Sequence, residues 1–547
     1  MKNKKILLFL AIAGLLAIVI YVSVGTKKEV ATTVNATIVP KDIPKDSTAP
    51  LPNDVENYTK QGYGIAESAP GVPIVKKEDI LPAGYAKPAK AGKNLLNFFT
   101  MSDIHIEDIQ SPAQVLFMGE KPIAGMSSAY SPTILYSTQV LDAAVRTVNK
   151  INENHKLDFG VMLGDAANSA QKNELNMYLD VLTGKTVNPN SDPAKKFDTD
   201  YMQPFKAEGL NVPWYQVLGN HDHFWSGVYN ANEKLKKALV GDTLMRTGFV
   251  MGSKELDGED FYGGIIDGTT KYGKIIGAGI SNGNDAQTHK ITPNPDREFI
   301  DSKAFVDMYT SEHGLKSGTS DPIACYTFEP KVNVPVRVIV LDDTAKQDEK
   351  FLDPTATSKI GTNAANGSLD KVRFEWLQKQ LKLAQEDGKL IIVATHIPVG
   401  MKGLWSAASE VSEEQFVNEL HKYSNMSLLI AGHRHINTIT AYPSPDPAKP
   451  EYGFWEVETA SLRDFPQQFR LFNINVNDNG TISIIATNVD PIGEKGSFME
   501  KSRSLAIAAG QIFPAPRGLI QPEEKSGAVN AELYKKLSQE MAAKLVK

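Results

Sequence analysis

Short apolar runs recur along the chain from Asn94 onward, and each of them ends in a cluster of polar residues. In chain order they read LLNFFTMSDIH, FGVMLGDAAN, WYQVLGNHDH, VRVIVLDDT, LIIVATHIP and LLIAGHRH. Continuous runs of this length, rich in β-branched and aromatic residues, are typical of strands that are buried on both faces. The pattern therefore predicts six core strands.

Helical patterns lie between these runs. Apolar residues recur at helical spacing in residues 133–154 and in residues 368–386, where we expect Ser368 to cap the N-terminus. The apolar positions of the two segments are Leu141, Val145, Val148 and Ile151, and then Leu369, Val372, Trp376 and Leu381. Ser412 and Gln415 have the spacing of a capping box before a further helix. Strands and helices alternate, which predicts an α/β core.

Two regions depart from this alternation. Residues 224–330 contain many glycines and short β-prone pieces, which predict an insertion of hairpins and loops. Beyond Gly453, two apolar segments predict antiparallel strands that close the sheet. The final residues predict a terminal amphipathic helix, with its apolar side formed by Leu533, Leu537, Met541 and Leu545. We therefore expect one globular domain at residues 93–495 and a C-terminal tail with this helix at residues 496–547.

The N-terminal 25 residues have the pattern of a membrane-targeting segment. Lysines precede an uncharged apolar run from Ile6 to Val24, which is nearly long enough to cross a bilayer core. The flanking positive charge places the N-terminus in the cytoplasm and the rest of the chain outside it. We favour an uncleaved membrane anchor, with a cleaved signal segment as the alternative. Residues 26–92, rich in proline, lysine and threonine, are expected to form a partly extended linker.

Composition narrows the possible classes of function. A chain of 547 residues is long enough for a large core with insertions. The formal net charge is −6, and no basic block suggests nucleic-acid binding. Cys325 is the only cysteine, so neither an internal disulfide nor a cysteine metal cluster is possible. Any metal site must therefore use His, Asp, Asn or Glu side chains.

Such side chains do follow five of the six predicted strands. They are Asp103 and His105, then Asp165, then Asn220, His221 and Asp222, then His396, and finally His433 and His435. Sites in open α/β sheets lie beyond the carboxyl ends of the strands, so we expect these residues to converge. Asp103 and His105 are two residues apart and would point the same way in an extended chain. Carboxylate, amide oxygen and imidazole together suit Zn, Mn or Fe ions, and two such ions can clamp a phosphoryl group.

The order of these blocks resembles the calcineurin-like metallophosphoesterase superfamily. The blocks read SDIH, GDAAN, GNHD, THIP and GHRH, and all five occur in order within residues 98–438. The resemblance implies a sandwich of two mixed β-sheets flanked by helices. It also implies two divalent or transition metal ions, Mn, Fe or Zn, with a hydroxide between them that attacks phosphorus.

The same resemblance implies a role for each residue. The first ion would be held by Asp103, His105, Asp165 and His435, and the second by Asp165, Asn220, His396 and His433, with Asp165 bridging. The two histidines of GHRH would alternate along a strand exit, so that each serves a different ion. His221 would contact the phosphate and the leaving oxygen, and Asp222 would orient His221 through its other ring nitrogen.

Other polar residues near these blocks receive weaker assignments. Purple acid phosphatases carry a tyrosine where this chain has Asn168, which excludes that subgroup, and we expect Asn168 to orient a neighbour. Arg434 should point away from its flanking histidines. Arg463 either reaches the site from its loop or forms a surface salt bridge. Asp342 and Asp343 are expected in a turn.

The sequence thus predicts a metal-dependent hydrolase of phosphate esters that faces outside the cytoplasm. A phosphodiester or nucleotide-like substrate is the first choice, and a phosphomonoester is the close alternative. Two other classes stay open: a non-catalytic metal-binding scaffold with this fold, and a metal-dependent hydrolase of a non-phosphate bond. All the predicted ligands and the histidine of GNHD are present, which favours the enzymes over the scaffold.

Overall fold

The computed structural model describes most of the chain from Thr32 onward. The described residues are 32–88, 90, 92–120, 130–247, 261–280, 289–313, 322–331, 333–346, 365–400, 404–513 and 525–545. The predicted anchor or signal segment, residues 1–25, lies outside them. Among the helices in these ranges, none combines the length and the apolar character needed to cross a membrane.

Two mixed β-sheets form the body of the molecule, as predicted. The first has the order β3 (Val75–Lys77), β22 (Ala531–Lys536), β21 (Thr481–Val489), β20 (Phe469–Val476), β4 (Lys93–Met101), β5 (Phe159–Met162), β8 (Trp214–Gln216). The second has the order β14 (Tyr326–Phe328), β15 (Val336–Val340), β16 (Leu390–Ala394), β17 (Met426–Ala431), β19 (Phe454–Glu458), β18 (Thr438–Tyr442). All six apolar runs form strands: β4, β5, β8, β15, β16 and β17.

The main hydrophobic core lies between the two sheets. It joins buried side chains from β4, β5, β20 and β21 of the first sheet to those of β15, β16, β17 and β19 of the second. At its centre, the ring of Phe98 stacks between Phe159 and Phe472, with ring centroids 4.8 and 4.6 Å apart. Burial of these apolar faces is the largest favourable contribution to the folding of such a sandwich.

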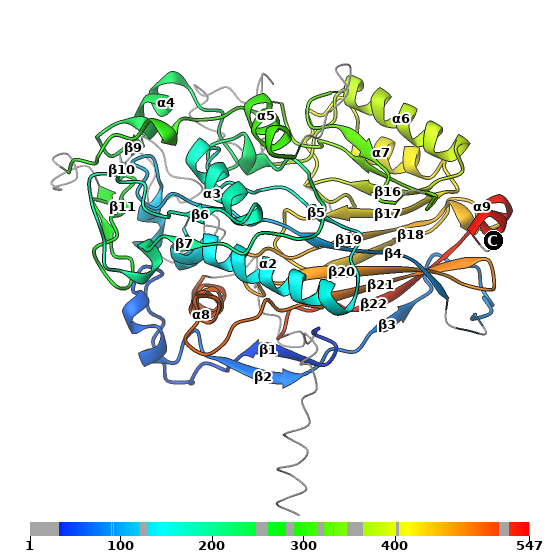
Figure 1. The fold of residues 1–547 in the computed structure, drawn as a ribbon, viewed down its shortest axis with the longest axis horizontal. Helices are drawn as coiled ribbons and strands as arrows, with labels where there is room; N and C mark the ends of the chain where they lie inside the picture. The colour runs from blue at the N-terminus through cyan, green and yellow to red at the C-terminus, as the bar shows by residue number, and fades with distance from the viewer. Residues whose placement is uncertain are drawn as a thin grey trace, which may run out of the picture. The chain divides into compact units, whose positions relative to one another are not determined.

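Helices cover the outer faces of both sheets (Figure 1). The helices α6 (Lys371–Glu386) and α7 (Glu413–Leu420) pack on the second sheet through a separate apolar cluster. The helices α2 (Ser137–Asn154), α3 (Lys172–Leu182) and α8 (Phe498–Ile512) lie on the side of the first sheet. The fold is therefore α/β, with helices outside a pair of mixed sheets.

The helix predicted at residues 368–386 is present as α6, with two differences from the prediction. Ser368 does not cap this helix, because its amide donates to the Asp343 carbonyl and Leu369 forms a bridge with Val411, which keeps this segment extended. The cap is Asp370, whose carboxylate accepts the amide of Arg373 at 2.8 Å. Val372 faces solvent rather than the core, with 63% of its surface exposed.

The two other helix predictions agree with the structure. The capping box of Ser412 and Gln415 is present at α7. The segment at residues 133–154 begins with the 3-10 helix η4 (Pro132–Tyr136), in which Ser131 is the N-cap, before α2.

The predicted insertion contains helices as well as hairpins. Its described parts include α4 (Glu233–Val240), α5 (Ser302–His313) and five two-residue strands, β9 (Arg246–Thr247), β10 (Phe261–Tyr262), β11 (Ile265–Ile266), β12 (Ile275–Ile276) and β13 (Gly279–Ile280). Its final strand, β14, joins the edge of the second sheet. A fully buried ion pair, Arg297 Nε to Asp108 Oδ2 at 2.9 Å, fastens the insertion to the loop that follows β4.

The segment predicted as a linker is largely packed from Thr32 onward. The strands β1 (Ala36–Pro40) and β2 (Ala66–Pro70) pair antiparallel, and β3 pairs with β22 in the first sheet. Thr33 is buried, and its hydroxyl donates to the Asn488 carbonyl at 2.9 Å. The backbone groups of this segment thus bond to the domain instead of to water, which an extended tether would not do.

The C-terminal amphipathic helix is shorter than predicted. Leu533 lies in β22, which fills the place between β21 and β3, and only α9 (Gln539–Leu545) is helical. The four apolar residues are nevertheless all buried in the main core. Their spacing reflects burial by a strand, a turn and a short helix in succession.

The stacked rings generate a prediction about stability. Replacing Phe98 by Ala should lower the free energy of unfolding by roughly 3–5 kcal/mol, because the central ring of a buried stack is lost and a cavity remains. Urea or thermal denaturation measures the change. Val372→Ala is the control, since the exposed position should change stability by less than about 0.5 kcal/mol. Equal effects at both positions would contradict a core centred on Phe98.

Candidate metal centre

The parallel strands of both sheets end at one shared edge. The strands β4, β5 and β8 are parallel in the first sheet, and β15, β16, β17 and β19 are parallel in the second. Buried bonds join the two sheets there: the hydroxyls of Thr100 and Thr459 lie 2.7 Å apart, and Ser461 Oγ donates to the Asp103 carbonyl at 2.7 Å. The turns that leave these strands therefore converge, as the sequence predicted.

The turns are tight rather than extended. Five candidate ligands have positive backbone φ angles: Asp103 (51°), His105 (51°), Asp165 (55°), His433 (73°) and His435 (62°). Left-handed conformations are unfavourable for residues with a Cβ and persist only where the surroundings impose them. The geometric argument from an extended chain was therefore wrong for Asp103 and His105, and the two histidines of GHRH do not alternate along a strand. Turns beyond β4 and β17 aim these side chains.

Glycines that precede two of the ligand-bearing loops are required by close packing. A Cβ on Gly432 would lie 1.8 Å from Ser102 Oγ and 2.8 Å from the Asp103 carboxylate. A Cβ on Gly219 would lie 2.2 Å from both the amide nitrogen and the carboxylate of Asp165. The glycines thus allow the strand exits to approach each other closely enough for their side chains to meet.

Asp103, His105 and His435 form one group of candidate ligands. The Nε2 atoms of His105 and His435 are 3.1 Å apart, and His435 Nε2 lies 3.3 Å from Asp103 Oδ1. Asp103 Oδ1 is buried without a hydrogen bond among the described residues, whereas its Oδ2 accepts the amide of His433 at 2.9 Å. A buried carboxylate oxygen that faces two imidazole nitrogens is the donor set of a metal site.

A second group lies beside it. Asp165 Oδ2 is 3.3 Å from His396 Nε2 and 3.6 Å from His105 Nε2. His396 Nε2 is also 3.0 Å from Asn220 Oδ1. His433 joins Asp165 and His396, with the three ligand atoms within 4.8 Å of one another. Asp165 Oδ2 therefore lies between the two groups, and all seven predicted ligands are brought together.

The cluster stabilises positive charge in a buried place. Burial by itself lowers the pKa of His396, but the carboxylates of Asp165 and Asp103 outweigh it and raise that pKa to about 10. Burial is likewise outweighed at His435, where Asp103 and Asp464 raise the pKa to about 9. The same carboxylates would stabilise a metal cation between these nitrogens. The charge and the donor atoms of the cluster both fit metal ions.

Surrounding groups fix the orientation of these ligands. Asp464 Oδ2 accepts from His435 Nδ1 at 2.7 Å, and the Leu163 carbonyl accepts from His396 Nδ1 at 2.7 Å. Asn220 Nδ2 donates to the Gly227 carbonyl at 2.8 Å, which turns the amide oxygen toward the cluster. Such contacts leave the Nε2 atoms and the amide oxygen facing inward. Asp464 was missed in the sequence, although it is an acidic residue shortly after the exit of β19.

His221 lies at the same edge, but its orienting partner differs from the prediction. Its Nδ1 is 2.7 Å from the backbone carbonyl oxygen of Asn168, and its ring is edge-on to that of His105. Asp222 does not make this contact. The Asp222 carboxylate instead accepts four amides, those of Asp165, Ala166, Ala167 and Gly219, at 2.8–3.0 Å. Asp222 fastens the loops after β5 and β8 to each other, and Asn168 orients His221.

The structure also places the four charged residues that received weaker assignments, Arg434, Asp342, Asp343 and Arg463. Arg434 points away from the cluster and pairs with the buried Glu458, as expected. Asp343 holds the turn at His396 by accepting its amide at 3.1 Å, and Asp342 pairs with Arg373, so neither joins the cluster. Arg463 is buried, with 4% of its surface exposed, and donates to Asn168, so the surface salt bridge is wrong.

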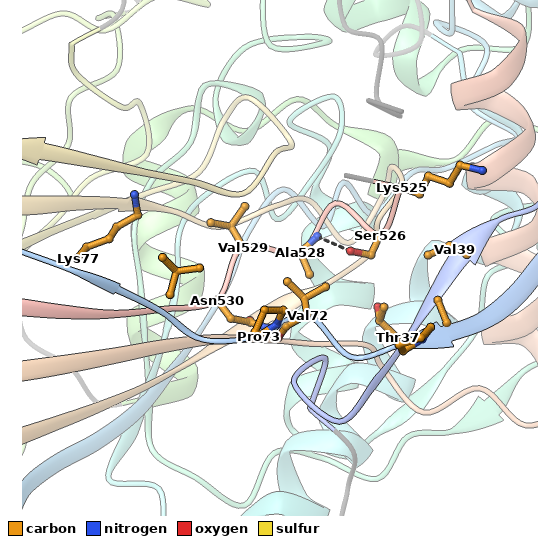
Figure 2. A pocket seen from close by; sticks show the side chains of 13 residues that line it. Thr37, Val39, Val72, Pro73, Lys77, Lys525, Ser526, Ala528, Val529 and Asn530 are labelled. Atoms are coloured by element: carbon orange, nitrogen blue, oxygen red, sulfur yellow. Dashed lines mark hydrogen bonds between the residues drawn. The ribbon is translucent and has the colours of Figure 1, made fainter. Parts of the chain in front are cut away.

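A separate groove of about 420 Å³ lies by the paired strands β1 and β2 and by β3 (Figure 2). Most of its lining side chains are small or apolar, such as Val39, Val72 and Ala528, with Lys77 and Lys525 also among them. None of the candidate metal ligands lines it. The site is therefore defined by its converging side chains and not by this groove.

The contact between Asp464 and His435 generates a prediction. Asp464→Ala should weaken Mn²⁺ binding by about 10- to 100-fold, because the His435 ring loses the carboxylate that sets its tautomer and direction. Isothermal titration calorimetry of the metal-free protein measures the affinity. Asp307→Ala on the exposed face of α5 is the control and should leave it unchanged. Unaltered binding in both variants would rule out an orienting role for Asp464.

Comparison with known proteins gives this geometry a family. A search of curated proteins found no match. Among solved structures, the chain is similar to a dimetal phosphatase from Danio rerio, at 12% sequence identity and a TM-score of 0.39, over 72% of this chain and 96% of that one. The family model of the calcineurin-like phosphoesterases matches residues 96–437. This match spans more than half of the chain and includes all five motif blocks, and the chain belongs to the calcineurin-like phosphoesterase family.

Proposed function

We propose that this protein hydrolyses a phosphodiester or nucleotide-like phosphate ester with two metal ions. The observation that carries the proposal is the position of Asp165 Oδ2, between His105 Nε2 at 3.6 Å and His396 Nε2 at 3.3 Å. A carboxylate oxygen with imidazole groups on both sides suits a ligand that is shared by two ions. Membership of the calcineurin-like phosphoesterase family supports hydrolysis of a phosphate ester in general. The preference for a diester is an analogy with members of that family.

The donor atoms divide naturally into two sets. Asp103, His105 and His435 would hold one ion, and Asn220, His396 and His433 the other, with Asp165 shared. When bound, the two ions supply an activated water and neutralise charge on the phosphoryl group. The tight turns at the ends of β4 and β17 direct these ligands toward one another.

His221 would assist departure of the leaving oxygen. The Asn168 carbonyl is a hydrogen-bond acceptor, so His221 Nδ1 carries a proton and Nε2 is the atom free to exchange one. Donation from Nε2 requires the imidazolium form of His221, in which both ring nitrogens carry a proton. Transfer of the Nε2 proton to the leaving oxygen would neutralise the charge that develops as the ester bond breaks and would leave His221 neutral. Asp222 contributes by holding the loops that carry Asp165 and Asn220 together.

The phosphomonoesterase is the close alternative, because the same ligands serve both reactions. A non-catalytic scaffold is disfavoured by the convergence of seven candidate ligands together with His221. A scaffold that only binds metal would not need an exchangeable imidazole such as His221 at this edge.

A paired assay tests the proposal. The purified protein is given an aryl phosphodiester and an aryl phosphomonoester, each with Mn²⁺ and again after chelation. We expect chelator-sensitive hydrolysis of the diester, and a decrease in kcat of roughly 10²- to 10⁴-fold in His221→Ala, because proton transfer to the leaving group is lost. The exposed His155→Ala is the matched control and should retain full activity.

Each outcome decides between candidate functions. Faster hydrolysis of the monoester would replace the diesterase by the phosphomonoesterase. No turnover of either ester in a protein that binds metal would favour the scaffold or a hydrolase of a non-phosphate bond. Full activity in His221→Ala would remove this histidine from the reaction while leaving the metal centre in place.

We further propose that the catalytic domain works outside the cytoplasm, held by an uncleaved N-terminal anchor. Lysines before the apolar run Ile6 to Val24 support this orientation. Residues 1–31 fused to a reporter that is active only outside the cytoplasm should give activity in the membrane fraction. A fusion that lacks residues 6–24 is the control. Reporter activity in the soluble exported fraction would indicate a cleaved signal, and no activity would overturn the proposal.

A further inference from the structure

Arg463 is a buried cation at the metal centre that has an unused hydrogen-bonding edge. Its backbone amide donates to Ser461 Oγ at 2.8 Å and to the Asp103 carbonyl at 3.3 Å, which fixes its loop against the exit of β4. Its Nη1 donates to Asn168 Oδ1 at 2.5 Å and lies 3.1 Å from Glu107 Oε2. The guanidinium therefore lies among the turns that carry Asp103, His105 and Asp165.

The remaining donors of this side chain have no acceptor among the described residues. Arg463 Nε and Nη2 are both buried and make no hydrogen bond there. These two nitrogens lie on the same side of a guanidinium and form a fork that matches two oxygens of a carboxylate or phosphate. Buried polar groups are almost always bonded in native proteins, so this fork is expected to have an acceptor that the described residues do not supply.

A second arginine in the same protein shows this fork in use. Arg434, in the GHRH block, donates from Nε to both oxygens of Glu458 at 3.0 and 2.9 Å, and its Nη2 also donates to Glu458. Among the described residues, Arg463 is the buried arginine in which both Nε and Nη2 lack an acceptor. In Arg373, Arg470 and Arg503 only one nitrogen does. Arg434 and Arg463 thus differ in whether the protein itself supplies an acceptor to the Nε–Nη2 edge.

Hydrogen bonds place Arg463 beside the residues of the proposed reaction. Its backbone amide donates to the carbonyl of Asp103, a member of the first group of ligands, at 3.3 Å. Its Nη1 partner Asn168 also holds His221 Nδ1 through its backbone carbonyl. The guanidinium is therefore near both the first group of ligands and the proposed proton donor.

We propose that the Nε–Nη2 edge of Arg463 binds two non-bridging oxygens of the substrate's phosphoryl group, which makes Arg463 a catalytic residue. The inference rests on the proposed function, because it places a phosphoryl group at this edge of the sheets. Glu107 and Asn168 hold Nη1, so that the opposite edge is presented to the ligand. The phosphate supplies the acceptor that Glu458 supplies to Arg434.

The test measures binding of inorganic phosphate to the full-length, metal-loaded protein by isothermal titration calorimetry, so that it does not depend on turnover. Arg463→Lys keeps the charge but loses the fork. We expect the dissociation constant of phosphate to rise about 10- to 100-fold, as for loss of hydrogen bonds to a charged group, with metal content unchanged. Arg146→Met, an exposed arginine on α2, is the control and should bind phosphate as the wild type does.

A second variant guards against misfolding. Arg463→Met with Glu107→Gln removes both charges of the buried ion pair, so that no carboxylate is left without its partner. This double variant should also bind phosphate at least tenfold more weakly. Unchanged phosphate affinity in either folded, metal-loaded variant would overturn the inference, and so would a wild type that binds metal but not phosphate. Failure to hydrolyse either ester, with phosphate binding still dependent on Arg463, would overturn the proposed function alone.

Discussion

Two buried carboxylates set the main constraint on this molecule. Asp103 and Asp165 lie almost fully out of water at the shared edge of the two sheets. A charged carboxylate in such a place is costly unless positive charge or several hydrogen bonds compensate it. The protein surrounds the pair with imidazole groups, and the carboxylates raise the pKa values of two of them, His396 and His435, which suits this arrangement to metal cations. The rest of the site follows from the need to hold these groups together.

The need to hold these groups together explains why the backbone is strained at the candidate metal ligands. Left-handed turns at five candidate ligands are unfavourable in themselves, and packing must offset them. The stack of Phe159, Phe98 and Phe472 lies on the strands that lead to the site, and the bond between Thr100 and Thr459 joins the two sheets beside it. Core packing thus stabilises a local geometry that the short turns alone would not adopt.

The polar groups that orient the ligands and hold their turns come from several loops. Asp464 orients His435, the Leu163 carbonyl orients His396, and Asn168 orients His221. Asp222 and Asp343 act on the backbone instead, by accepting amides from the turns at Asp165 and His396. His435, His396 and His221 are therefore each fixed by a group from a different segment of the chain, which makes the cluster dependent on several loops of the fold. Arg463 joins this arrangement with one edge bonded and the other edge open.

The sequence by itself determined the strands, the order of the polar residues that follow them and the candidate ligands. Buried parallel strands need continuous apolar runs, and parallel strands place their carboxyl ends at one edge, so both features are visible in local pattern. Helix starts were less visible, because a tertiary bridge at Leu369 moved the cap of α6 from Ser368 to Asp370. The linker and the terminal helix were misjudged for the same reason, since pairing of β3 with β22 depends on segments far apart in the chain.

Only the tertiary structure decided how the site residues are oriented. Nothing in the GNHD block indicates that the Asn168 carbonyl, and not Asp222, contacts the ring of His221. Arg434 and Arg463 each follow one of two neighbouring strands, β17 and β19, and they differ because a buried glutamate from β19 meets the fork of the first and not of the second. Motif spacing records which side chains reach the edge of a sheet. Contacts between distant segments decide which of their atoms are left free, because hydrogen bonds depend on distances and angles that spacing does not contain.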